Sequence, residues 1–166
     1  PNTANPHAVP SDRVIEKGDF VLMDYGAGYC DYRSDMTRTV VMGEPTQEQL
    51  DLYALVRRTH EECVAAIHPG VEGNDIFKLS KKIIGDAGYG DYYNHGLGHG
   101  VGIDIHELPN FNRSKNIIEV GSVITMEPGV YLPGVGGVRL EDYGVVPENG
   151  YEPFTKTPHD LHVIDC

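Results

Sequence analysis

Short apolar runs separated by turn residues make up most of this chain, and two amphipathic stretches interrupt them. The run that begins at Phe20 is followed, after a glycine-containing turn, by a second run that ends near Met42. Runs of this kind, joined by a turn, predict an antiparallel hairpin. After Tyr89, further β-prone segments predict strands near residues 95–99, 122–127 and 137–147, with a last edge strand near 151–154.

The two amphipathic stretches predict helices. Thr46-Gln-Glu-Gln is a capping box, and His68-Pro-Gly ends the helix that begins there. The residues that recur at helical spacing are Leu50, Tyr53, Val56 or Arg57, His60, Cys63 or Val64, and Ile67, with His60 expected at the surface or flank. Asn74 is expected to cap a second helix through about Ala87, with Ile76, Leu79, Ile83 and Ile84 inward. Helices between hairpins predict an α+β fold.

Four carboxylates, Asp24, Asp35, Glu127 and Glu141, lie inside short apolar runs that otherwise read as buried strands. Burying one unpaired carboxylate costs several kcal/mol, so four of them in a core need strong compensation. The alternative is that some are edge-strand carboxylates that face water, as most Asp and Glu side chains do. Bound divalent cations are the compensation that the pattern favours.

Hairpin spacing pairs these carboxylates. A hairpin that turns at Tyr29-Cys30 places Asp24 opposite Asp35, with Cβ atoms roughly 5 Å apart on one face. A second hairpin, centred on Gly134 within Pro133-Gly-Val-Gly-Gly, repeats the arrangement for Glu127 and Glu141. Like charges at this separation repel unless a cation lies between them.

Three histidines, His95, His99 and His106, lie in a glycine-rich stretch, where missing side chains let the backbone pack closely around a site. A lone histidine in an apolar segment is more often hydrogen-bonded than a ligand, but three within twelve positions favour function. Four carboxylates with an imidazole suit a pair of hard or borderline divalent ions better than one structural zinc. The glycines lack the strand, helix start and downstream acid of a dinucleotide fingerprint.

The composition narrows the classes of partner. A chain of 166 residues with 40% hydrophobic content supports one domain, here residues 1–166. A formal net charge of -12 argues against nucleic acid and against anionic membranes as partners. Cys30, Cys63 and Cys166 are odd in number and widely spaced, so neither a disulfide framework nor a zinc ribbon is indicated. With no long apolar run and no signal peptide at its start, the chain is expected in the cytoplasm.

Separated sequence motifs carry a resemblance to a known family. Together they resemble the catalytic domain of the metallopeptidases with the pita-bread fold, and within that group the Xaa-Pro peptidases, prolidase and aminopeptidase P. The motifs are Met23-Asp-Tyr-Gly with Ser34-Asp-Met-Thr-Arg-Thr, His95-Gly-Leu-Gly-His-Gly-Val-Gly with His106-Glu-Leu-Pro, Thr125-Met-Glu-Pro-Gly, and Val138-Arg-Leu-Glu-Asp. Family domains begin with a helical segment and a strand before the position of Pro1, so the resemblance implies a domain incomplete at its N-terminal end.

The resemblance implies a ligand set and accessory residues. The metal ligands are Asp24, Asp35, His99, Glu127 and Glu141, with Asp35 and Glu141 bridging two ions. Substrate positioning and proton movement fall to His7, His95 and His106, the last also as the oxyanion donor. Glu127 is the expected general base. Arg139 is placed with the substrate-binding residues and orients an acidic ligand; its alternative is an ordinary salt bridge.

The implied activity is hydrolysis of the peptide bond before proline in Xaa-Pro dipeptides or short Xaa-Pro peptides. The cofactors would be two divalent ions, Mn²⁺ first, with Co²⁺, Zn²⁺ and Fe²⁺ also compatible with the ligand set. They would lower the pKa of a shared water toward neutrality. The implied partners are a short proline-containing peptide and, for the full-length protein, a second copy in a homodimer.

Three alternatives remain. Methionine aminopeptidases share the metal set, but usually carry Phe-Glu-His around the last ligand and lack a histidine at the position of His95, whereas this chain has Arg139-Leu-Glu-Asp. Creatinase shares the fold without the metals, and the intact ligand set counts against it. A non-enzymatic peptidase-like binding module would be expected to lose ligands, and none is lost.

Overall fold

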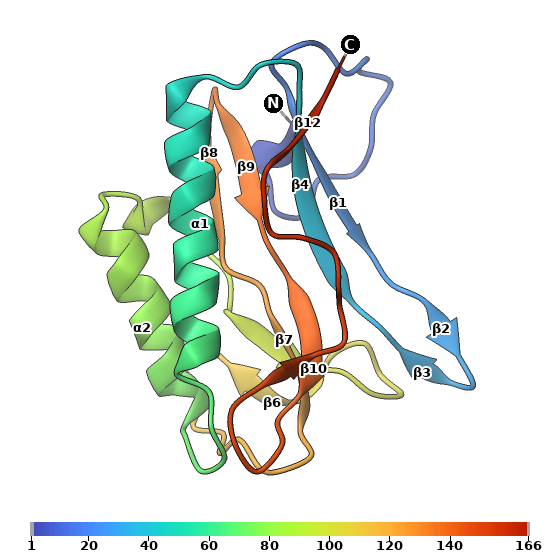
Figure 1. Cartoon of the computed structure of the whole chain (residues 1–166), viewed down its shortest axis with the longest axis vertical. Helices are drawn as coiled ribbons and strands as arrows, with labels where there is room; N and C mark the ends of the chain where they lie inside the picture. The colour runs from blue at the N-terminus through green and yellow to red at the C-terminus, as the bar shows by residue number, and fades with distance from the viewer. Residues whose placement is uncertain (1, 166) are drawn as a thin grey trace.

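Two helices lie side by side on one face of the strands, and the first hairpin projects from the other side (Figure 1). The structure is a computed structural model that describes residues 2–165. The helices are α1, Gln47–Ala65, and α2, Gly73–Asp86, with short 3₁₀ turns at Asn2–Ala4 and Gly90–Tyr92. The strands are β1 Phe20–Tyr25, β2 Gly28–Tyr29, β3 Tyr32–Arg33, β4 Met36–Met42, β5 Gly98–Gly100, β6 Glu107–Phe111, β7 Val123–Met126, β8 Gly129–Leu132, β9 Gly136–Arg139, β10 Asp142–Val145, β11 Glu152–Pro153 and β12 His162–Ile164. The predicted α+β class is confirmed.

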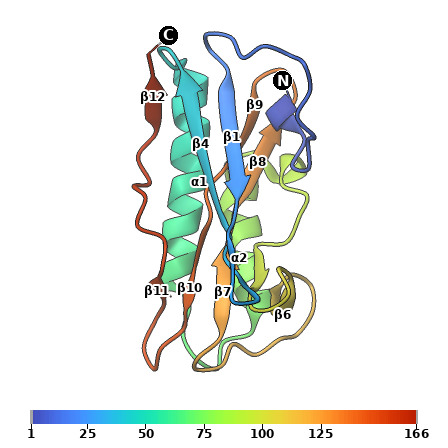
Figure 2. The same cartoon turned by 90° about the vertical axis from the view of Figure 1, so that its right-hand side faces the viewer.

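The strands form two main sheets and two ribbons. The order is β1-β4-β12 in the three-stranded sheet and β11-β10-β7-β5-β6 in the five-stranded sheet, while β2 pairs with β3 and β8 with β9. Seen from the hairpin side, these strands lie in front of both helices (Figure 2). The predicted edge strand is confirmed as β11. Strands β6 and β12 were not predicted, because one contains Pro109 and the other has only three residues, so neither shows a clear alternation.

Helix α1 begins where the capping box predicts. The Thr46 hydroxyl accepts from the Gln49 N–H, and the Gln49 side chain accepts from the Thr46 N–H. Two assignments are wrong: Leu50, expected on the inward face, is 40% exposed, and His60, expected at the surface or flank, is 2% exposed. His60 follows Val56 by four positions on one helix face, and that face, which also carries Leu52 and Tyr53, packs against the strands.

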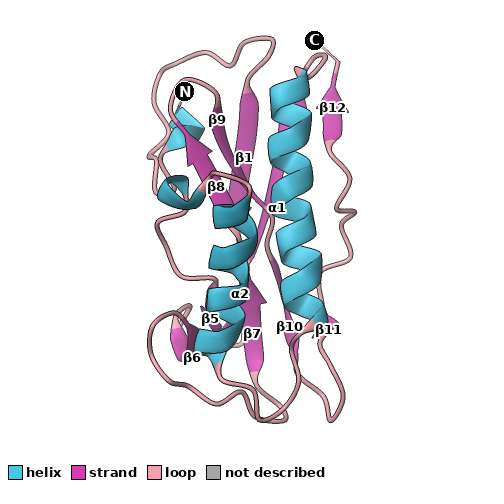
Figure 3. Ribbon diagram, turned by 90° about the vertical axis from the view of Figure 1, so that its left-hand side faces the viewer, coloured by secondary structure: helices cyan, strands magenta, loops and turns pink. Residues whose placement is uncertain are grey.

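Helix α2 packs beside α1 (Figure 3) and largely follows its prediction. Ile76, Ile83 and Ile84 are buried. Its N-cap is Glu72 instead of Asn74, because the Asn74 side chain donates to the carbonyl of Asn112 and is not free to cap. The helices and strands enclose two apolar clusters, and each large side chain buried there contributes roughly 1.5–3 kcal/mol.

The register of the first hairpin differs from the prediction. Asp24 pairs with Thr37 instead of Asp35, because the turn is centred on Cys30 and Asp31, one position later than expected. Both turn residues have a positive φ, 48° and 68°, as a type I′ turn requires. The shift moves each partner by two positions, so Asp24 and Asp35 stay on one face of the ribbon.

The second hairpin has the predicted register. β8 pairs Gly129 with Arg139, and β7 pairs Met126 with Asp142, so the same register continues on both sides of Glu127 and Glu141. Glu141 also bridges to Thr37 on β4, which joins the two hairpins. No helix among residues 2–165 is both long and apolar enough to cross a membrane.

Candidate metal centre

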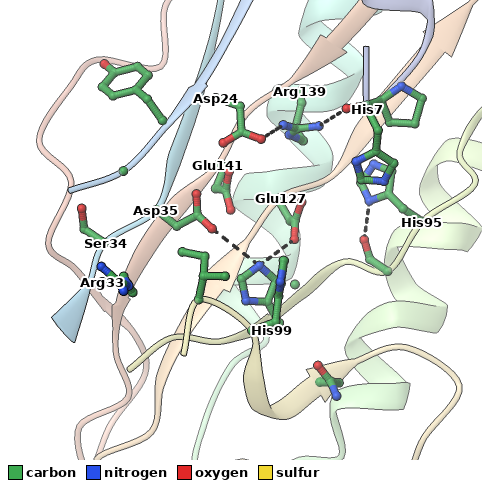
Figure 4. Close-up of a pocket in the computed structure, with 18 of the residues that line it drawn as sticks. His7, Asp24, Arg33, Ser34, Asp35, His95, His99, Glu127, Arg139 and Glu141 are labelled. Carbon is green, nitrogen blue, oxygen red and sulfur yellow. Dashed lines mark hydrogen bonds and ion pairs between the residues drawn. The ribbon is translucent and has the colours of Figure 1, made fainter. Parts of the chain in front are cut away.

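All nine residues singled out in the sequence line one cavity of about 660 Å³ (Figure 4). They come from both hairpins, from the glycine-rich stretch and from the N-terminal segment. Their positions are His7 near the N-terminus, Asp24 on β1, Asp35 before β4, His95 before β5, His99 on β5, His106 before β6, Glu127 after β7, Arg139 on β9 and Glu141 between β9 and β10. The fold therefore gathers segments that are more than 100 residues apart in the chain.

Three of these side chains form a tight buried group. One ligand atom each of Asp35, His99 and Glu141 lies within 4.8 Å of the others, and all three residues are buried. His99 Nε2 is 3.7 Å from Asp35 Oδ2 and 3.4 Å from Glu127 Oε1. Figure 4 shows Asp35 and Glu127 on either side of the His99 ring. Four donor groups thus converge on one wall of the cavity.

The backbone fixes the His99 ring in an orientation suited to ligation. A Cβ atom at Gly98 would collide with the carbonyl of Thr125, and one at Gly100 with the carbonyl of Leu108, so these glycines let the strand approach its neighbours closely. His99 Nδ1–H donates to the carbonyl oxygen of Gly100 at 3.0 Å. Burial lowers the pKa of His99, so the ring is neutral and its Nε2 lone pair faces the carboxylates.

The carboxylates of this group are poorly compensated by the protein. Burial, followed by the charge of Asp24, raises the pKa of Asp35 to about 6. Burial raises the pKa of Glu127 to about 7, and burial with the nearby charge of Glu127 raises the pKa of Glu141 well above its usual value. At neutral pH, full ionisation therefore requires added positive charge. Oxygen-rich donors with one neutral imidazole fit divalent cations.

Arg139 holds Asp24 in this arrangement. The guanidinium is 3% exposed, and its Nη2 donates to Asp24 Oδ2 at 2.5 Å. Its Nε donates to the Thr37 hydroxyl at 3.0 Å, and that hydroxyl donates to Glu141 Oε2 at 2.6 Å. The contact with Asp24 is an ion pair, the alternative given for Arg139, while the orientation of an acidic ligand stays a prediction.

Tyr131 extends this network to His95. Arg139 Nη1 donates to the Tyr131 hydroxyl at 3.1 Å, which donates to His95 Nε2 at 2.8 Å. His95 Nδ1–H donates to the carbonyl of Gly96 at 2.6 Å, so both ring nitrogens have partners. The roles of Tyr131 and Thr37 were missed in the sequence. For Tyr131 a signal existed, because the register of the second hairpin places it opposite Gly137, on the face that carries Arg139.

His7 and His106 lie at the accessible side of the cavity. Both are exposed, and the His106 ring centroid is 4.2 Å from that of His99. His7 follows Pro6, whose carbonyl accepts from Arg139 Nη1 at 3.3 Å. This hydrogen bond ties the N-terminal segment to the metal-facing network, so His7 is held near the opening of the cavity.

Comparisons with known proteins agree with this geometry. The model of metallopeptidase family M24 matches residues 1–148. The Xaa-Pro dipeptidase of Pyrococcus furiosus is 44% identical over 160 residues, which are 96% of this chain and 46% of that enzyme. The prolidase structure from Pyrococcus horikoshii superposes with a TM-score of 0.93 at 42% identity, covering 96% of this chain and 46% of that chain. The X-Pro aminopeptidase of Thermotoga maritima gives 0.94 at 36% identity, covering 98% and 46%.

These matches confirm the pita-bread fold that the resemblance implied. The chain spans about half the length of the relatives it matches. Because the family match extends over residues 1–148 and the identity to the P. furiosus enzyme is 44%, this chain belongs to metallopeptidase family M24.

Proposed function

We propose that this chain provides the catalytic centre of a dinuclear metallo-exopeptidase that hydrolyses the bond before proline in Xaa-Pro dipeptides or short Xaa-Pro peptides. The observation that carries the proposal is the buried group of Asp35, His99 and Glu141, with Glu127 beside it, on one wall of an open cavity. The printed names of the relatives, Xaa-Pro dipeptidase and prolidase, support the substrate class.

The proposed ligands are Asp24, Asp35, His99, Glu127 and Glu141, which place four carboxylates and one imidazole around the same space. When bound, two divalent ions would polarise the scissile carbonyl and ease deprotonation of the attacking water. Mn²⁺ is the first candidate because oxygen donors predominate, and Co²⁺, Zn²⁺ and Fe²⁺ accept the same set.

Glu127 is the proposed proton carrier. Burial raises the pKa of Glu127 to about 7, so a carboxyl group that can exchange a proton near neutral pH lines the cavity, which supports this assignment. Hydrolysis adds water across the amide: the oxygen attacks the carbonyl carbon, the C–N bond breaks, and a proton is needed at the leaving proline nitrogen. Glu127 accepts the proton from the water and delivers it to that nitrogen.

The remaining cavity residues bind and orient the substrate. His106 is the proposed donor to the developing oxyanion, and His7 approaches the substrate from the N-terminal segment. His95 is held by Tyr131 and Gly96, so we assign it a positioning role in the wall of the cavity. Arg139 acts through Asp24, which it holds in place.

Proline explains the need for a dedicated site. The Xaa-Pro bond is a tertiary amide without an N–H, and the proline ring fixes φ, so recognition as an extended strand fails. We further propose that the protein works in the cytoplasm, as a homodimer, on peptides instead of nucleic acid or membranes. The net charge of -12 and the free Cys30 and Cys63 support this setting.

The test is a substrate panel with the intact protein that carries this sequence. Each of Mn²⁺, Co²⁺ and Zn²⁺ is added to metal-free protein, and hydrolysis of Ala-Pro, Ala-Pro-Ala and Met-Ala is measured. We expect cleavage of the Xaa-Pro peptides and little cleavage of Met-Ala. Faster cleavage of Met-Ala would support the methionine aminopeptidase alternative, and a protein that retains no metal would support the binding module.

A further inference from the structure

A second group of metal-binding side chains lies outside the cavity. One ligand atom each of His60, Asp142 and His159 lies within 4.8 Å of the others. His60 comes from α1, Asp142 from β10, and His159 from the segment that joins β11 to β12. Figure 3 shows this segment beside α1. Asp142 follows Glu141 directly, so the side chains of the two residues point to opposite faces of the strand.

His60 is the unusual member of this group. It is 2% exposed, and neither of its ring nitrogens has a hydrogen-bond partner. Among residues 2–165, no other buried side-chain nitrogen or oxygen lacks a partner. A neutral imidazole has one N–H and one lone pair, and burying either without a partner destabilises the folded protein. The His60 ring therefore has an unpaired nitrogen, Nε2, at 3.4 Å from Asp142 Oδ2.

The distances are close to those of a zinc site. Bonds of 2.0–2.1 Å in a tetrahedron place neighbouring ligand atoms roughly 3.3 Å apart. His60 Nε2 is 3.4 Å from Asp142 Oδ2, which matches, while His159 Nε2 is 2.6 Å from the same oxygen. His159 has to withdraw by roughly 0.7 Å to match the same tetrahedral spacing. Its side chain is 26% exposed, so it has room to move and leaves the site open to solvent.

The surroundings hold the group in place. Asp142 Oδ1 accepts from Arg38 Nη2 at 2.6 Å and from the Thr155 hydroxyl at 2.5 Å, which leaves Oδ2 facing both histidines. The Tyr53 hydroxyl donates to the carbonyl of His159 at 3.2 Å, fixing its backbone against α1. Hydrogen-bonded carboxylates of this kind are typical of the outer shell of metal sites.

We propose that His60, Asp142 and His159 form a second metal site that binds one zinc ion, with water as the fourth ligand. Two imidazoles and one carboxylate suit zinc, whereas the oxygen-rich cavity suits manganese. The ion ties the segment between β11 and β12 to α1 and β10. The site lies on the strand face opposite the cavity, so zinc binding there can be measured separately from the peptidase activity proposed for the cavity.

The test measures zinc in a background that lacks the first centre. The variant Asp35→Asn/His99→Ala is stripped with chelator, given two equivalents of Zn²⁺ and desalted, and zinc is counted by elemental analysis. We expect one zinc per chain. Adding His159→Ala should reduce the count to near zero, while the matched control His162→Ala, an exposed histidine three positions later, should keep it. The proposal would be overturned if the Asp35→Asn/His99→Ala protein retains no zinc, or if its zinc content is the same with and without His159.

Thermal denaturation gives a second readout. In the background variant, Zn²⁺ should raise Tm by on the order of 5 °C, and the rise should vanish with His159→Ala. His60→Leu should also lose zinc but raise the zinc-free Tm, because it replaces an unpaired buried ring with apolar atoms of similar size. A His60→Leu protein that still binds zinc would overturn the assignment of His60 as a ligand, and a Tm that does not respond to zinc would overturn the site.

Discussion

Glu141 and Asp142 are adjacent carboxylates, each 2% exposed, and the protein treats them in opposite ways. Burial and a neighbouring carboxylate raise the pKa of Glu141, and within residues 2–165 the one side chain that donates to it is Thr37. Burial also opposes ionisation of Asp142, but hydrogen bonds from His159 and other donors outweigh it and lower its pKa. The Arg38 guanidinium adds a positive charge beside this carboxylate, with Nη2 2.6 Å from Asp142 Oδ1.

The difference separates a carboxylate that the protein stabilises without a metal ion from one that needs a bound cation to ionise. Arg38 and the other donors keep Asp142 ionised even in chelator, so its loss should damage stability there. Glu141 lacks a cation of its own, so its loss should damage metal binding and activity while leaving the fold intact. The face that carries Glu141 opens to a cavity, and the face that carries Asp142 packs against α1.

The largest effect is expected for Glu141→Gln. It keeps the shape of the side chain but removes a negative charge, so kcat on an Xaa-Pro peptide should fall about 10³-fold and the metal content should fall. In chelator, Tm should stay the same or rise, because repulsion with Glu127 is removed. Glu152→Gln on the exposed edge strand is the control and should change neither quantity. A large fall in the Tm of Glu141→Gln in chelator would contradict the contrast drawn between Glu141 and Asp142.

Asp142→Asn should show the reverse pattern. The free energy of unfolding, measured by urea titration in chelator, should fall by about 3–5 kcal/mol because the buried Arg38 loses its charged partner. Combining it with Arg38→Met should recover part of this loss, since no unpaired charge remains. A loss below about 1 kcal/mol, within the range of surface ion pairs, would contradict the structural role of Asp142.

Local signals explain which parts of the fold could be predicted. The capping box fixes the start of α1 through neighbouring residues, and the glycine at 134 fixes the turn of the second hairpin. The first hairpin turns at Cys30 and Asp31, which adopt positive φ without a glycine to mark it, so its register was misplaced by two positions. Strand β12 is recognisable only through its parallel pairing with β4, more than 100 residues away.

The candidate-site residues also divide into those that a local sequence signal marks and those that only the folded structure brings together. The carboxylates of the cavity stood out because each interrupts an apolar run, which is a local anomaly. His60 showed no such anomaly, since its helix face also carries polar residues. Its burial depends on how α1 packs against the segment that contains His159, and that contact joins positions 99 residues apart, which sequence spacing does not encode.

Tyr131→Phe tests how far the supporting network reaches from the cavity. Loss of the hydroxyl removes the link between Arg139 and His95, so kcat/KM should fall roughly 10-fold, with a stability loss of about 1 kcal/mol. Tyr25→Phe is the matched control: Tyr25 also lines the cavity but is exposed, and its change should be neutral. If the two variants change kcat/KM and stability equally, the Tyr131 hydroxyl does not support His95, and the residue only lines the cavity.

The smallest effect is the pH dependence of the metal-free protein. The folded-state pKa values of Glu127, about 7, and of Glu141 are raised above their unfolded values, so their contribution to stability is present at low pH and is lost as pH rises. The buried histidines have lowered pKa values, so they add stability as pH rises through 6.5, their unfolded value, and the carboxylates dominate above about pH 7.5. Between about pH 7.5 and 8.5, Tm in chelator should therefore fall by roughly 3 °C.

Two further measurements identify the groups that cause Tm to fall with pH. Excess Mn²⁺ should reverse it, because cation binding favours the ionised carboxylates and releases their protons. Glu127→Gln/Glu141→Gln should flatten it in chelator, because the two groups that titrate in this range are gone. If the double variant keeps the full slope, the protons come from elsewhere, and the contrast between Glu141 and Asp142 then rests on their hydrogen-bond partners alone.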